Sequence, residues 1–354
     1  MTTHEELQQI PRSKSWRTLR GMRAFPPGAA SSGVHADKRA TMFNAALEQA
    51  EQMFTAAATV GPQTRPLLLF YGLSQAGRAI AAAATRLPAT KGGAQEWKLK
   101  GHGISTDPSN AGSSLAEVMI RPEGGGSTSF VGVAKALDSP AIAPTGVRLG
   151  DLYATIPEAK TMQIESDPAF PALLANIQPT GVPATTEGFF SAVLSFVPAR
   201  LEAVLDDQEQ LVQATEFLDR YPSLSGWTFN PRAAALPVVT GGVPGFATMT
   251  VYWPFSKSPA APIADQVATA YRGFTHYVFP AVSGNARPLH PLLAWWGVLH
   301  ALSAVARYEP EGWFKAIDID RQGHRTANAV EHLLDAALDA VPELVVMAIN
   351  QAST

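Results

Sequence analysis

The sequence contains no cysteine among its 354 residues. This absence excludes disulfide bonds, thiolate metal ligands and cysteine nucleophiles. It fits a reducing compartment, and the first residues, MTTHEELQQIPRSKSW, contain no apolar core of the kind that marks a secretory signal. We therefore expect a cytoplasmic protein.

The sequence also lacks an excess of charge of either sign. Charged residues make up 16% of the chain and the formal net charge is −3. The chain as a whole therefore has no basic field of the kind that drives binding to nucleic acids or anionic membranes. One local basic segment is present, and we expect residues 1–37 to form a basic arm that is solvated or used for docking. Its basic residues are Arg12, Lys14, Arg17, Arg20 and Arg23.

No stretch of the sequence has the pattern of a membrane span. The longest apolar run, residues 289–306, approaches the ~20 residues that a span needs. It contains His290, Pro291 and His300, and Arg307 follows it directly. We expect a buried helix here and no insertion into a membrane.

Metal and phosphate-loop motifs are missing as well. The sequence has no HExxH motif and no paired histidine–carboxylate spacing. The glycine runs at 124–126 and 241–245 lack the lysine and helix that follow a phosphate-binding loop. We therefore expect neither a metal nor a cofactor.

The apolar pattern changes twice along the chain. Residues 38–90 have the pattern of an alanine-rich helical hairpin, and residues 286–354 that of further helices. Between them, residues 91–285 contain short apolar runs of the kind found in antiparallel strands, with one helix near 201–221. The predicted strands are 115–122, 128–137, 160–167, 189–198, 236–241, 246–255 and 276–282.

This order of elements predicts an α+β protein. We expect the N-terminal hairpin and the C-terminal helices to pack into one helical bundle, because helices this apolar need neighbours. The β-rich, mostly antiparallel middle region would then be an insertion against one end of the bundle.

Residues 66–87, PLLLFYGLSQAGRAIAAAATRL, fit two incompatible structures. As strand, turn and helix they resemble a nucleophile elbow that presents Ser74 to a histidine base. Such a hydrolase needs strands before the elbow, whereas an arm and a helix precede it here. The residues that could complete a triad, Asp318 or Asp320 with His324, lie only a few positions apart. We favour one continuous helix, whose glycines permit close packing.

Several short motifs carry a resemblance to a known family. The early motifs are FYGLSQAGRA (70–79) and HGI (102–104), and the late ones are HALS (300–303), Arg307 with Tyr308, Pro310 and Trp313. In order and spacing they resemble the YaaC-like family of uncharacterised bacterial proteins over most of the chain. The sequence departs from the family pattern at Glu309, where a histidine is expected. The resemblance implies an architecture rather than an activity.

His300 and Arg307 lie seven residues apart on a predicted helix and therefore share one face. An arginine beside a histidine can hold a phosphate and move a proton, as metal-independent RNA cleavage requires. The helical parts also resemble HEPN domains of toxin and antiviral systems, in which the arginine comes first and the spacing is shorter. We favour a structural interpretation of the pair, with a core histidine and an arginine that caps the helix C-terminus or pairs with a carboxylate such as Glu309.

Four further residues are candidates for ligand binding. Tyr71, Gln75 and Arg78 lie near one another on the helix predicted at 66–87, and Arg78 would approach His300 or Arg307 if the bundle forms as expected. His102 stands between two glycines, where the backbone can come close to a ligand. Converging arginines would make an anion site.

These patterns favour a binding or assembly module, with a protein partner or a second copy of the chain. A role in a stress or antiviral system follows only from the HEPN analogy. Two enzymes remain as alternatives, namely a HEPN-like nuclease using His300 and Arg307 and a serine hydrolase using Ser74. The net charge gives no support to a nucleic acid partner, and the sequence leaves open whether the protein is an enzyme.

Overall fold

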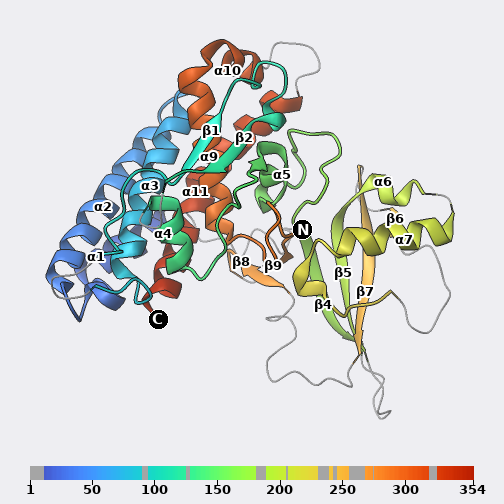
Figure 1. Cartoon of the computed structure of the whole chain (residues 1–354), viewed down its shortest axis with the longest axis horizontal. Coiled ribbons are helices and arrows are strands. Elements are labelled where there is room, and N and C mark those ends of the chain that lie inside the picture. The colour runs from blue at the N-terminus through green and yellow to red at the C-terminus, as the bar shows by residue number, and fades with distance from the viewer. Residues whose placement is uncertain are drawn as a thin grey trace.

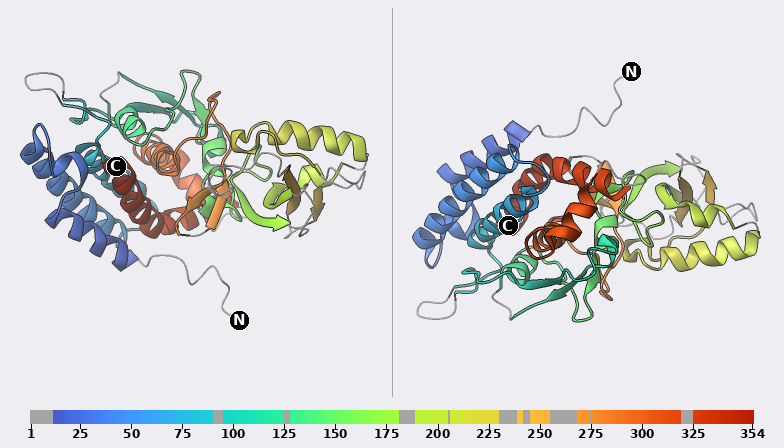
Figure 2. Two further views of the ribbon diagram at one scale, coloured as in Figure 1. Left: turned by 90° about the horizontal axis from the view of Figure 1, so that it is seen from below. Right: turned by 90° about the horizontal axis from the view of Figure 1, so that it is seen from above.

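The computed structural model places helices from both ends of the chain in one body, beside a smaller part built on a sheet (Figure 1). In both views of Figure 2, the first helices lie alongside the last one. Antiparallel strands come between them in the chain. The predicted α+β class is therefore confirmed. The described residues are 12–89, 95–124, 128–180, 189–204, 206–229, 239–241, 245–254, 268–273, 275–318 and 325–354.

Helix α3, Arg65–Ala83, is the centre of the helical body, and most of its residues are buried. Pro66 lies in its first turn, where a missing N–H breaks no helical hydrogen bond. Because helices surround it, α3 positions side chains toward several neighbours at once. These neighbours are α2 (Ala36–Ala57), α4 (Ser129–Ala136), α9 (Pro291–Tyr308) and α11 (Arg325–Ser353), and α10 (Pro310–Ile317) joins the last two.

Two glycines of α3 allow its neighbours to approach closely. A Cβ atom at Gly72 would lie 2.7 Å from the ring of Phe54 on α2. A Cβ atom at Gly77 would lie 2.3 Å from the ring of Trp296 on α9. Both separations are far below van der Waals contact, so the close packing expected from these glycines is present.

The basic segment near the N-terminus is a packed helix rather than an arm. Helix α1, Arg12–Ala24, lies against α2 and α11. Trp16 and Leu19 are buried because their spacing of three places both on the face toward the bundle. Its charges are also engaged, since two arginines form ion pairs with glutamates of α2. These pairs are Arg20 with Glu51 and Arg23 with Glu48.

Two antiparallel sheets follow. The small one has the order β1-β2-β3 and lies over α9 and α5 (Leu149–Ala154). The larger one has the order β6-β7-β5-β4-β9-β8. The strands are β1 Ile104–Asp107, β2 Met119–Pro122, β3 Val147–Arg148, β4 Leu173–Thr180, β5 Phe189–Pro198, β6 Val239–Gly241, β7 Phe246–Pro254, β8 Thr269–Tyr271 and β9 Thr275–Val278.

Several predicted elements of the middle region were wrong. Residues 128–137 form helix α4 instead of a strand, since a run buried on nearly all sides carries no strand or helix period. Residues 160–167 form turns and bends, and the helix expected near 201–221 is two helices. Strands β1, β3, β4 and β8 and helix α5 were not predicted. The two helices are α6 (Ala199–Glu202) and α7 (Asp207–Leu218).

The side chains form two hydrophobic cores. The larger core joins the helical body to the small sheet and to the aromatic residues Tyr271, Tyr277 and Phe279 near the β8–β9 hairpin. The smaller core lies between strands β4 to β7 and helices α6 and α7. The large sheet therefore spans both cores, and its β8–β9 end lies against the helical body. Within the described residues, no helix is long and apolar enough to cross a membrane.

Candidate functional site

Three separate segments bring five of the predicted site residues together. Tyr71 and Arg78 come from α3, His102 from the loop before β1, and His300 and Arg307 from α9. The ring centres of His102 and His300 are 5.8 Å apart, and those of Tyr71 and His102 are 6.3 Å apart. We call these five residues the histidine–arginine cluster. It forms because α3 and α9 pack together and β1 lies over α9.

His300 is the buried member of the cluster, with 4% of its surface exposed. Its Nδ1 atom lies 2.8 Å from the Oγ1 atom of Thr106, and its ring meets Phe70 edge to face at 5.0 Å. Burial, together with the nearby His102 and Arg307, lowers the pKa of His300 to about 3. The imidazole is therefore neutral at pH 7, with one N–H group but without the second, acidic proton of an imidazolium.

His102 is half-buried between two glycines that both have positive φ angles, +58° at Gly101 and +85° at Gly103. A Cβ atom at Gly103 would lie 2.6 Å from Oγ1 of Thr128, so glycine is required for this close turn. Burial lowers the pKa of His102 and the positive charge of Arg307 lowers it further, whereas Glu123 raises it by less than this, and Arg78 has the smallest, lowering effect. His102 is thus also kept neutral.

Arg307 lies at the C-terminal end of α9 and is half-buried. Its Nε atom donates to the carbonyl oxygen of Ser303 at 3.2 Å, as expected for an arginine that caps a helix C-terminus. Its Nη1 atom donates to the hydroxyl of Tyr71 at 3.1 Å. The exposed ring of Tyr308 lies 4.8 Å from the guanidinium carbon. Among the described residues no carboxylate pairs with Arg307.

Arg78 adds a second positive charge to the same place. Its Nη1 atom makes one long hydrogen bond, 3.4 Å, to the carbonyl oxygen of Leu99. Its Nε atom is buried without a hydrogen-bond partner in the described part of the chain. Two guanidinium groups therefore lie near His102, and Arg78 keeps a donor without an acceptor in the described residues, which is an arrangement suited to an anion.

The remaining predicted site residues do not join this cluster. Ser74 is buried in the middle of α3, with no turn beside it, so the geometry of a nucleophile elbow is absent. Asp318 follows the end of α10, whereas Asp320 and His324 lie outside the described residues. Gln75 is a half-buried residue of α3 and forms no hydrogen bond with the cluster within the described residues. We therefore do not propose a serine hydrolase.

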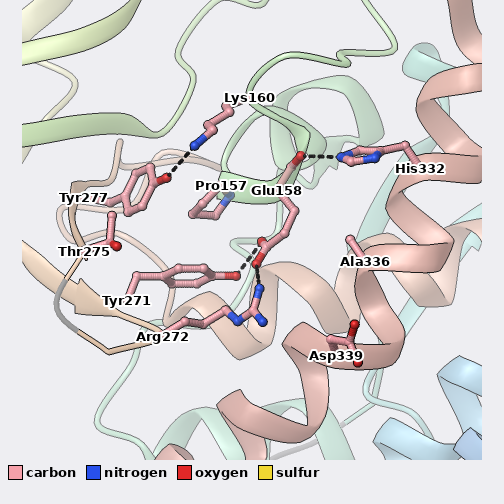
Figure 3. A pocket seen from close by; sticks show the side chains of 10 residues that line it. All are labelled: Pro157, Glu158, Lys160, Tyr271, Arg272, Thr275, Tyr277, His332, Ala336 and Asp339. Atoms are coloured by element: carbon pink, nitrogen blue, oxygen red, sulfur yellow. Dashed lines mark hydrogen bonds and ion pairs between the residues drawn. The ribbon is translucent and has the colours of Figure 1, made fainter. Parts of the chain in front are cut away.

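A second polar site was not predicted from the sequence (Figure 3). Arg272, in the turn between β8 and β9, donates from Nη1 to Glu158 at 2.7 Å and from Nε to Glu343 of α11 at 3.0 Å. The hydroxyl of Tyr271 donates to Glu158 at 2.7 Å and accepts from the indole of Trp295 at 3.1 Å. Across the described residues, no group of three or more histidines and carboxylates is placed to hold a metal ion.

Comparison with known proteins supports the resemblance that the motifs indicated. The family model described as YaaC-like Protein matches residues 27–349, a range that includes every residue of both polar sites. No curated protein and no solved structure matches the chain. Since the family model covers nearly the whole chain, the protein belongs to the YaaC-like family.

Proposed function

We propose that this protein is a binding module that holds a phosphate-bearing ligand at the histidine–arginine cluster. One observation carries the proposal, namely that two arginines with no carboxylate partner among the described residues both act on His102, beside the Tyr71 hydroxyl and the neutral His300. Guanidinium groups bind phosphate oxygens through charge-assisted hydrogen bonds, which are stronger than neutral ones. An anion would also reduce the repulsion between the two half-buried arginines.

The ligand we favour is a nucleotide or the end of a single-stranded RNA. The exposed ring of Tyr308 lies against the guanidinium of Arg307, so it offers a base a face to stack on while the arginine holds the phosphate. This local arrangement supports a short ligand. It does not require the extended basic surface that the net charge of −3 argues against.

A HEPN-like nuclease would use the same residues but needs an imidazole that can donate a proton. The pKa values of His102 and His300 are both lowered, so neither ring is the imidazolium that acts as a general acid at neutral pH. General acid catalysis works best when the catalytic pKa lies near the working pH. The cluster therefore supports binding better than cleavage, and a place in an antiviral system rests only on fold-level analogy.

The test is to measure the affinity of the full chain for nucleoside monophosphates and for a labelled short RNA, by calorimetry and fluorescence anisotropy. Arg307→Gln and Arg78→Gln should each weaken binding by roughly tenfold or more, since hydrogen bonds to charged groups contribute about 1.5–3 kcal/mol. Arg287→Gln is the matched control. Arg287 is exposed, lies outside the cluster and forms a long ion pair with Asp138, at 3.9 Å.

Three outcomes are informative. Unchanged affinity in both cluster variants would refute the site, as would the absence of any binding by the wild-type chain. Shortening of the RNA that disappears in His300→Asn would replace the binding function with the nuclease. The assembly expected from the sequence is tested separately by light scattering of the purified chain, where a monomer with no co-purifying protein counts against it.

A further inference from the structure

The second polar site lines a cavity of about 290 Å³ between the helical body and the β8–β9 hairpin. In Figure 3, His332, Ala336 and Asp339 form a stripe along α11 on one side of it. Glu158 and the side chains of the hairpin face this stripe from the other side. A volume of this size, at the lower end of the ~300–1,000 Å³ typical of ligand pockets, suits a small metabolite.

A buried set of charges lies at the cavity, and two of its three members, Arg272 and Glu158, line it. The side chains of Arg272, Glu158 and Glu343 are 6%, 12% and 1% exposed. One guanidinium therefore lies between two carboxylates. Burial alone would lower the pKa of Arg272, but the two carboxylates raise it above its usual value, so the guanidinium stays charged.

The guanidinium of Arg272 has one donor that this set of charges does not use. Its Nη2 atom is buried and has no hydrogen-bond partner in the described part of the chain. A buried charged donor without an acceptor is costly, and Arg272 is also held at a φ of +45°, which is strained for a residue with a side chain. Both features favour a ligand that brings an acceptor to the guanidinium.

Charges of both signs surround the cavity. Asp339 is exposed and forms no ion pair among the described residues, and it adds to the negative charge of Glu158. Lys160 lies on the opposite side, with its Nζ atom 3.5 Å from the hydroxyl of Tyr277. The rings of Tyr271 and Tyr277 supply apolar surface beside these charges.

We propose that this cavity binds a small zwitterion of the α-amino acid type, with its carboxylate on Arg272 and its ammonium group between Glu158 and Asp339. The ligand carboxylate supplies the acceptor that Nη2 lacks. Its ammonium group pairs with Glu158 and Asp339, the two carboxylates that line the cavity. This site is independent of the histidine–arginine cluster, so either proposal can fail without the other.

The experiment measures binding of each common L-amino acid to the full chain by calorimetry and by the shift in melting temperature. At least one amino acid should bind saturably, and Asp339→Asn should weaken it by roughly tenfold, the effect of losing about 1.4 kcal/mol. Asp339 is exposed, so the variant should fold. Glu331→Gln is the matched control, because Glu331 is exposed on the same helix but does not line the cavity.

Two derivatives of the bound amino acid test its carboxylate and its ammonium group separately. Its amide lacks the carboxylate and should lose affinity because Arg272 is left without an acceptor. Its N-acetyl form lacks the ammonium group and should lose affinity at Glu158 and Asp339. The proposal is overturned if no amino acid binds, if Asp339→Asn binds as well as wild type, or if either derivative binds as tightly as the parent.

Discussion

The two polar sites use arginine in opposite ways. In the cavity below the β8–β9 hairpin, the fold itself surrounds Arg272 with two carboxylates. In the histidine–arginine cluster, Arg78 and Arg307 meet carbonyl and hydroxyl oxygens but no carboxylate of the residues that the structure describes. The comparison indicates that the charge of Arg272 is needed for folding, whereas the charges of Arg78 and Arg307 are available to a ligand. Substitutions at each site can separate these roles.

The largest effect is expected from Arg272→Met. It leaves Glu158 and Glu343 buried without their counter-charge, and breaking a buried pair in this way costs about 3–5 kcal/mol. Urea denaturation would show this as a lower midpoint. A loss below about 1 kcal/mol, the range of surface ion pairs, would show that the two sites do not differ as described.

A smaller loss of stability is expected from Gly77→Ala, which acts through packing rather than charge. The new Cβ atom would lie 2.3 Å from the ring of Trp296 and force α3 and α9 apart, at a cost of about 1–3 kcal/mol. Because these helices carry the cluster, ligand affinity there should fall as well. Gly21→Ala on α1 is the control, since nothing lies within 4 Å of its new Cβ atom.

The neutral histidine His300 of the cluster should make the stability of the protein depend on pH. The pKa of His300 is about 3 in the folded protein and near 6.5 when unfolded, so the unfolded chain binds the proton more tightly. The contribution of His300 to the free energy of unfolding should therefore be constant above pH ~6.5 and decrease as the pH falls from ~6.5 to ~3. The decrease should be at most about 1.4 kcal/mol per pH unit.

This slope is measured by denaturation at a series of pH values in that window. His300→Asn should reduce the slope, but should not abolish it, because burial also lowers the pKa of His290 to about 4. If the variant and the wild type lose stability in parallel as the pH falls, His300 is not the neutral buried group that the structure describes.

The smallest effect on stability is expected from Arg307→Gln. Arg307 is half-buried and has no carboxylate partner in the described residues, so its loss should cost about 1 kcal/mol or less, the value of one hydrogen bond. Denaturation and ligand binding are measured on the same sample. A variant that binds normally but unfolds easily would reverse the comparison between the two sites.

The cluster could be predicted from the sequence because its parts follow local rules. The seven-residue spacing of His300 and Arg307 places them on one helix face, and the glycines beside His102 mark a turn. The predicted helices also had clear periodicity. The segment at 129–136 did not, because α4 is buried on nearly all sides and its sequence carries no polar face.

The cavity could not be predicted in this way. Glu158, Arg272 and Glu343 come from a short turn, a hairpin and the last helix, and no spacing in the sequence connects them. The only local signal is a glutamate within the apolar stripe of α11, where a fully buried charge requires a partner. The identity of that partner depends on how the large sheet meets the bundle, which the sequence pattern does not specify.

The large sheet also has a consequence for how the molecule opens. In the described residues, β4 pairs with β5 along seven positions but with β9 at only two, Leu173 with Val278 and Leu174 with Tyr277. This junction lies between the two cores. Strands β4 to β7 can therefore exchange their amide hydrogens with solvent as one unit, while the β8–β9 hairpin stays protected together with the helices.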